Sequence, residues 1–149
     1  MNQKPTQNIE PQGYIQWEEL ETANLSFTPS STPAITSVRA ALRVSTIANG
    51  LTNTPSVEIV AALNALSFED VKVHDYNSVG QEEFTLQARE WTKRGAQAGL
   101  YYALLRVEAG KKEEEVKNMA EKLLVRFNTD IDGGITPTLP LVMVIGRKS

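Results

Sequence analysis

The chain has 149 residues, carries a formal net charge of −3 and contains no cysteine. This length suits a single domain whose core is large enough to fold without disulfides or metal ions. The composition excludes thiolate catalysis and iron–sulfur clusters, and outside residues 1–34 the acids and bases cancel, which does not favour nucleic acid as a specific ligand.

Residues 1–35 form the first predicted segment, an extended N-terminal arm. Four of the seven prolines fall here among many Gln, Asn, Ser and Thr residues, a composition that breaks helices and buries little surface. Tyr14, Trp17 and Phe27 are nevertheless large aromatic residues that a solvated linker has little reason to carry. We therefore expect them to dock, and the docking surface is either a partner chain or the protein's own core.

Residues 36–128 are predicted to form a bundle of antiparallel helices. The first helix begins near Thr36 or Ser37, whose hydroxyl groups can cap it, and it ends at Asn49–Gly50. A second helix opens at Thr54–Pro55, because proline suits a first-turn position whose N–H group needs no partner.

The segment after the second helix, residues 68–81, favours an extended structure. Residues 71–76 alternate apolar and polar side chains, as in a half-buried strand. Ser67 and Asp70 have the spacing of a helix start, so a further helical turn is the alternative.

A long helix over residues 84–109 is the clearest pattern in the sequence. Its stripe recurs at steps of four and three residues and comprises Phe84, Ala88, Trp91, Gly95, Ala98, Tyr102, Leu105 and Ala109. Because the stripe is small at Gly95 and Ala98, we expect another backbone to pack closely there. Gly110 ends this helix, and residues 111–127 form an outer helix with a heavily charged face.

Residues 129–149 are predicted to be a loop followed by a short C-terminal strand. The strand is the apolar run Leu141, Val142, Met143, Val144 and Ile145, which is too short for a helix. Its backbone groups need partners, either residues 71–76 and the arm or a strand of another chain. The predicted fold is therefore mainly α, an antiparallel helical bundle with an extended N-terminal arm and a short C-terminal β-strand. The candidate interface consists of Tyr14, Trp17, Phe27 and the five residues of this strand.

Residues 128–135 resemble the start of an EF-hand calcium loop, with oxygen-bearing side chains at the first, third and fifth positions and glycine at the sixth. The twelfth position, which needs a bidentate glutamate, is Leu139. The segment is therefore predicted to be a plain turn, and a weak cation site is the alternative. We expect no resident metal ion or cofactor.

The sequence does not predict an enzyme. His74 is the only histidine, and no nucleophile motif surrounds it. Gly133–Gly134 lacks the lysine and the helix of a phosphate-binding loop. Since no stretch approaches the ~18 apolar residues of a membrane-spanning helix and the N-terminus lacks the apolar run of a signal peptide, we expect a soluble protein.

The order of the predicted elements resembles that of the head–tail adaptor (connector) proteins of tailed bacteriophages. The resemblance covers residues 36–145 and lies in the helix order, the long central helix with Trp91-Thr92-Lys93-Arg94, the charged helix and the extended tail. It implies a structural virion protein of the phage neck, made in the host cytoplasm, that forms a homo-oligomeric ring and binds the portal and other neck or tail proteins through its terminal arms. The alternative is a small cytoplasmic binding or regulatory module, helical and monomeric or dimeric, with both termini folded onto its core.

Overall fold

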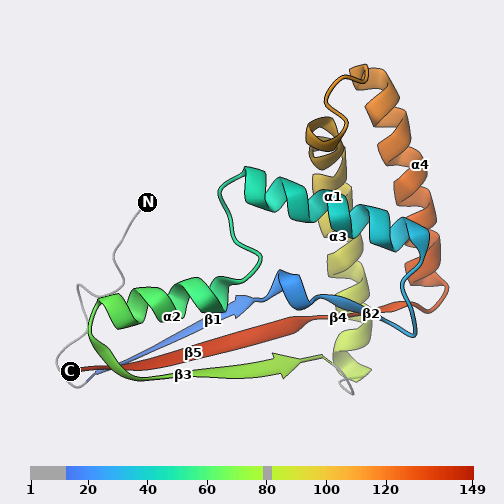
Figure 1. The fold of residues 1–149 in the computed structure, drawn as a ribbon. Helices are drawn as coiled ribbons and strands as arrows, with labels where there is room; N and C mark the ends of the chain where they lie inside the picture. The colour runs from blue at the N-terminus through green and yellow to red at the C-terminus, as the bar shows by residue number, and fades with distance from the viewer. Residues whose placement is uncertain (1–12, 79–81) are drawn as a thin grey trace. The chain divides into compact units, whose positions relative to one another are not determined.

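The computed structural model describes residues 13–78 and 82–149, which form four α-helices and two antiparallel β-sheets (Figure 1). The fold of these residues is therefore α+β, and the predicted mainly helical bundle with one short strand is wrong. The described chain divides into two compact units, one of residues 13–22, 54–77 and 140–149 and the other of residues 23–53, 78 and 82–139. The first twelve residues of the predicted arm lie outside the described residues.

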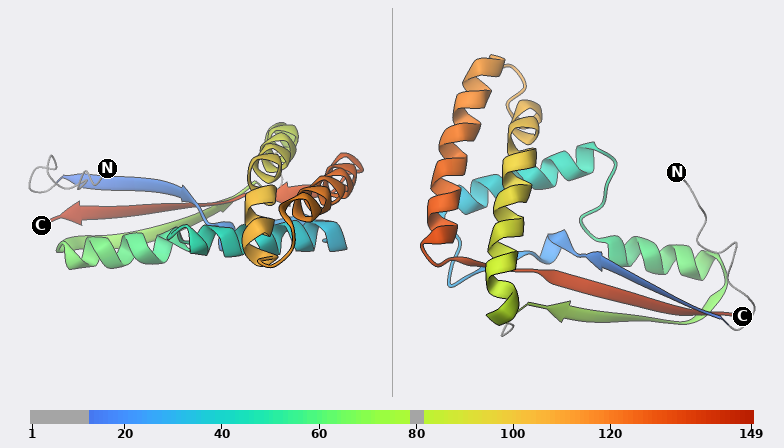
Figure 2. Two further views of the ribbon diagram at one scale, coloured as in Figure 1. Left: turned by 90° about the horizontal axis from the view of Figure 1, so that it is seen from above. Right: turned by 180° about the vertical axis from the view of Figure 1, so that it is seen from behind.

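The first unit is a three-stranded antiparallel sheet with one helix. Strands β1 (Tyr14–Leu20) and β3 (Phe68–Asn77) both pair with β5 (Pro140–Lys148), so the strand order is β1-β5-β3. Helix α2 (Pro55–Ala65) begins at the proline, as predicted, and lies along one side of the sheet (Figure 2). Because β5 hydrogen-bonds to a strand on each side, its backbone needs no strand from another chain.

Apolar side chains from α2 and all three strands form the core of this unit. Its buried members are Ile15, Leu63, Phe68 and Val144. A Cβ atom at Gly146 would lie 3.3 Å from both Leu63 Cδ1 and Phe68 Cδ1, so the glycine lets the helix and the sheet come together. At the start of β3 the register shifts between Glu69 and Lys72, and Asp70 adopts the left-handed conformation with φ 51° that aspartate tolerates.

The second unit is built on three helices of the described chain. They are α1 (Pro33–Ala48), α3 (Glu82–Val107) and α4 (Glu113–Asp132), accompanied by the two-stranded sheet of β2 (Ser26–Thr28) and β4 (Thr136–Thr138). A 3-10 turn, η1 (Thr22–Asn24), follows β1. The cap of α1 is Thr32 and not Thr36 or Ser37, because Thr32 Oγ1 accepts a hydrogen bond from the Ile35 N–H group at 3.2 Å. The helix therefore begins one turn earlier than predicted.

The core of the second unit lies where its three helices meet. Fully buried side chains include Ile35, Val38, Leu100, Ala103, Val116, Phe127 and Ile131. The predicted stripe of α3 faces largely outward, since Phe84, Trp91 and Tyr102 are exposed. The buried side of α3 carries Ala88, Ala96, Leu100, Ala103 and Leu104. Of the predicted stripe only Ala88 is fully buried, and the close packing expected at Gly95 and Ala98 is wrong because both residues are exposed.

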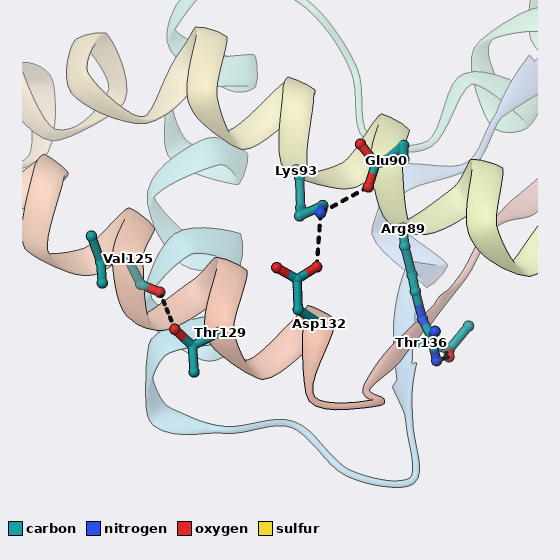
Figure 3. A network of polar contacts seen from close by, with 7 residues as sticks. All are labelled: Arg89, Glu90, Lys93, Val125, Thr129, Asp132 and Thr136. Atoms are coloured by element: carbon teal, nitrogen blue, oxygen red, sulfur yellow. Dashed lines mark hydrogen bonds and ion pairs between the residues drawn. The ribbon is translucent and has the colours of Figure 1, made fainter.

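Polar contacts join α3 to the end of α4 and to β4 (Figure 3). Lys93 Nζ lies 2.7 Å from Glu90 Oε1 and 2.8 Å from Asp132 Oδ1. The hydrogen bonds to these two carboxylates, that of Asp132 first, raise the pKa of the Lys93 ammonium group above its ordinary value. Arg89 donates to Thr136 Oγ1 at 2.7 Å and to the Gly134 carbonyl oxygen at 3.2 Å. This end of α4 is thus fixed by charged hydrogen bonds.

Candidate functional site

Alternation along β5 separates the residues of the predicted C-terminal interface. Val142 and Val144 are 2% and 0% exposed and point to the same side of the sheet as the α2 core. Leu141, Met143 and Ile145 point to the opposite side and are partly exposed. Of the five residues of the predicted strand, only Leu141, Met143 and Ile145 can therefore contact another molecule on this side.

The register of the three strands shows which residues share this second side. Residues directly opposite one another in an antiparallel sheet point to the same face. Three rows follow, Gln16–Ile145–Lys72, Glu18–Met143–His74 and Leu20–Leu141–Tyr76. We call these nine residues, together with the row Tyr14–Arg147–Glu69 at one end, the open face.

Within the first unit, none of the described helices lies over the open face, because α2 packs on the other side (Figure 2). Tyr14 is 69% exposed, and Leu20, Tyr76 and Leu141 are also exposed. An antiparallel sheet commonly buries one face and presents polar residues on the other. Here the central strand instead presents leucine, methionine and isoleucine to the outside, so the open face is an apolar surface on a rigid sheet.

Polar side chains border the apolar centre, and their kinds differ between the two edges. Gln16 and Glu18 lie on β1, where Gln16 Nε2 donates to Glu18 Oε1 at 2.7 Å. Lys72 and His74 lie on β3. In the two middle rows the face therefore carries an amide and a carboxylate on β1 and nitrogen-bearing side chains on β3, while Glu69 adds a carboxylate at the end of β3. Arg147, at the end of β5, is paired with Glu69 at 2.7 Å and Asp70 at 3.3 Å.

The remaining predicted interface residues lie elsewhere. Trp17 is opposite Val144 on the α2 side of the sheet and is 38% exposed. Phe27 belongs to β2 of the second unit, where it is partly buried and packs against the helical core. The structure therefore brings together Tyr14, Leu141, Met143 and Ile145, and it does not bring Trp17, Val142, Val144 or Phe27 onto the same surface.

Sequence reasoning missed the β1 and β3 residues of the open face other than Tyr14. The alternation of Lys72, His74 and Tyr76 was a signal that they share one side of a strand. The register with Ile145, Met143 and Leu141 could not be predicted, because the paired residues are more than 60 positions apart in the sequence and no local pattern specifies their pairing.

The EF-hand-like segment does not form a calcium loop. Residues 128–132 are the last turn of α4, so their side chains fan out around a helix. Asp130 accepts a hydrogen bond from Thr32 Oγ1, and Asp132 is paired with Lys93. In the described part of the chain, no group of three or more His, Asp or Glu side chains is placed to hold a metal ion.

A surface groove of about 530 Å³ lies in the second unit and is lined by Thr32, Pro33, Ala34, Ser37, Leu123, Val125, Arg126, Thr129 and Asp130. Two of its polar groups, Thr32 and Asp130, are hydrogen-bonded to each other. His74 belongs to the first unit, in a row with Glu18 and Met143 on the open face.

No helix within residues 13–78 and 82–149 has the length and apolar character needed to cross a bilayer. The sequence matches no protein-family model and is not significantly similar to any curated protein.

Proposed function

We propose that this protein is a structural protein without a catalytic role, which acts by associating with protein chains through its open face. The observation that carries the proposal is that Leu141, Met143 and Ile145 of the central strand point to the open face, over which none of the described helices of the first unit lies. Exposed apolar patches rimmed by polar residues are typical of protein-binding surfaces. Docking on a sheet also requires little ordering of the backbone, because the strands are already paired.

In its more specific form the proposal is a head–tail adaptor in the neck of a tailed-bacteriophage virion. Its partners are then copies of itself, the portal and other neck or tail proteins. The support is the resemblance in helix order, which in the second unit corresponds to α1, the long α3 and the charged α4. A ring of identical subunits also needs head-to-tail contacts, for which the exposed aromatic residues of α3 offer a second surface.

The role of the open face is tested by sedimentation velocity on the full chain. The double substitution Leu141→Lys and Met143→Lys places two charges in the apolar centre, and Val57→Lys on the exposed side of α2 is the matched control. We expect the wild type and the control to associate and the double variant to sediment as a monomer with an unchanged circular dichroism spectrum. If the double variant is misfolded, Tyr76→Lys at the sheet edge makes the same test. Association that survives these open-face substitutions contradicts the proposal.

The adaptor form is tested by electron microscopy of the chain alone and with a co-expressed portal protein. Rings, or added density on the portal, support it. A chain that adds no mass to portal particles contradicts it.

One observation favours the second candidate, a small binding module whose termini fold onto its own core. Both β1 and β5 pair within the chain, so neither strand has to be exchanged with a neighbour. A monomer at all concentrations whose residues 13–22 and 140–148 resist protease would favour this module.

A further inference from the structure

The polar residues of the open face differ between β1 and β3, whereas Leu141, Met143 and Ile145 make its centre on β5 apolar. In the middle row, Glu18 on β1 and His74 on β3 lie on either side of Met143. The two are separated by two strand spacings, about 10 Å, so they are too far apart to bond within one sheet. The neighbouring rows place Gln16 across from Lys72 and Leu20 across from Tyr76 in the same way.

Two identical sheets can stack face to face about either of two axes that lie between them. An axis that runs along β5 places β1 of one copy over β3 of the other. Each row then faces the same row of the second copy, with its β1 and β3 ends exchanged. Glu18 then faces His74, Gln16 faces Lys72, and Met143 faces Met143. An axis across the strands places β1 over β1, so Glu18 faces Glu18 and like charges oppose one another.

We propose that the partner of the open face is a second copy of the same face, related by a two-fold axis along β5. This inference rests on the proposed function and names its partner. In this pair, the carboxylate of Glu18 accepts a hydrogen bond from the imidazole of His74 in the other copy, and the contact occurs twice. Leu20 packs on Tyr76, and the three apolar residues of β5 meet their equivalents at the centre. At the end of β5 Arg147 faces Arg147, and each guanidinium is paired within its own copy with Glu69 and Asp70.

A second copy of the open face is favoured as the partner because its side chains complement those of the first copy. In the two middle rows Glu18 requires a nitrogen donor opposite it, Lys72 and His74 require acceptors, and the centre requires apolar side chains. The face itself meets all three conditions once it is reversed. The strands of two stacked, aligned sheets cross at about −30°. The middle rows of the two copies therefore lie directly over each other, and the outer rows are displaced sideways.

The area of the contact predicts a weak pair. Three strands about 4.8 Å apart, followed over the seven residues of β1 at about 3.4 Å each, cover roughly 340 Å². For both copies the footprint is about 680 Å², which is below the ~1,200 Å² that stable specific interfaces bury, so the pair should be weak and depend on protein concentration. A two-fold pair uses only the open face and is separate from any contacts that close a ring.

The experiment is a charge exchange measured by sedimentation equilibrium on the full chain. Glu18→Lys opposes a lysine to His74, and His74→Glu opposes two carboxylates, so each variant alone should raise the dissociation constant at least tenfold. An equimolar mixture of the two variants restores both contacts, since one site keeps Glu18 against His74 and the other pairs the introduced lysine with the introduced glutamate. The mixture should form a 1:1 pair with a dissociation constant within threefold of the wild type.

The matched control is Glu19→Lys, the next residue of β1, which points to the other face of the sheet. It should leave pairing unchanged. If Glu18→Lys weakens pairing but the mixture does not recover it, the two-fold arrangement is overturned while association through the open face stands. If Glu19→Lys weakens pairing as much as Glu18→Lys, the inference is overturned. A wild type that stays monomeric at every concentration overturns the inference and removes self-association from the proposed function.

Discussion

Gly99 of α3 packs so closely on Leu42 of α1 that a Cβ atom at position 99 would lie 3.0 Å from Leu42 Cδ2. A Cβ atom at Gly95, on the outward side of the same helix, would have nothing within 4 Å. The two glycines therefore have different roles, although the sequence places both inside one helix.

Substitution of these glycines should have opposite effects. Gly95→Ala should raise the free energy of unfolding by about 1 kcal/mol, because alanine is the better helix former and meets no neighbour. Gly99→Val should lower it by about 1–3 kcal/mol, because the larger side chain overpacks the contact with Leu42. Urea unfolding followed by circular dichroism measures both. Equal shifts for Gly95→Val and Gly99→Val would show that α1 and α3 do not approach at Gly99.

The core of the first unit gives a second prediction, on two apolar residues of α2. Leu63 is 3% exposed and packs on β1, β3 and β5, whereas Val57 is 65% exposed. Leu63→Ala should cost about 2–5 kcal/mol of stability, through lost burial and the cavity left behind. Val57→Ala should change stability by less than about 0.5 kcal/mol. Thermal unfolding of both variants compares them, and a Leu63→Ala protein as stable as the wild type would place α2 away from the sheet.

Stability at alkaline pH should depend on Lys93. Its pKa is raised by Asp132 and Glu90, so the folded state holds the proton more tightly than the unfolded state, whose ordinary value is 10.5. The resulting stabilisation is present in full below pH 10.5 and is lost as the pH rises through the raised pKa. Melting temperatures of the wild type and of Lys93→Met should therefore differ at pH 8 and converge at strongly alkaline pH. The control is Lys117→Met, an exposed lysine of α4, and a difference that grows with pH would have the wrong sign.

Calcium should not bind at residues 128–135. Asp132 forms an ion pair with Lys93. Residues 128–132 are helical, so their side-chain oxygen atoms do not converge on one point. Titration with calcium up to millimolar concentration should leave the tryptophan fluorescence and the melting temperature unchanged. A saturable change that disappears in Asp132→Asn would establish a site after all.

The helices were largely predictable because their signals are local. Pro55 begins α2, and the charged face of residues 111–127 belongs to α4, which runs on to Asp132. The face of α3 was less readable, since small residues occur on both sides of it. Gly95 and Ala98 repeat on the outward side, and Ala96 and Ala103 on the buried one. The period of a pattern identifies a helix without deciding which of two apolar sides is buried.

The sheet was predictable only in part. Strands near residues 71–76 and 141–145 were expected, whereas β1 and the pairing of all three strands within the chain were not decided. In β1 the apolar residues fall on both sides of the alternation, with Tyr14 and Leu20 on one face and Ile15 and Trp17 on the other. Such a strand has no clean period of two, and its pairing with β5 depends on residues at the far end of the sequence. Of the candidate interface, Tyr14, Leu141, Met143 and Ile145 share one surface, but their neighbours Lys72 and His74 come from register alone.

The central position of β5 has a consequence for synthesis. Strands β1 and β3 are both made before β5, yet each forms its ladder with β5. Until residue 148 emerges, the nascent chain carries two unsatisfied strands that are prone to aggregate. Translation products that stop short of β5 cannot complete this unit, so a premature stop removes the sheet as a whole.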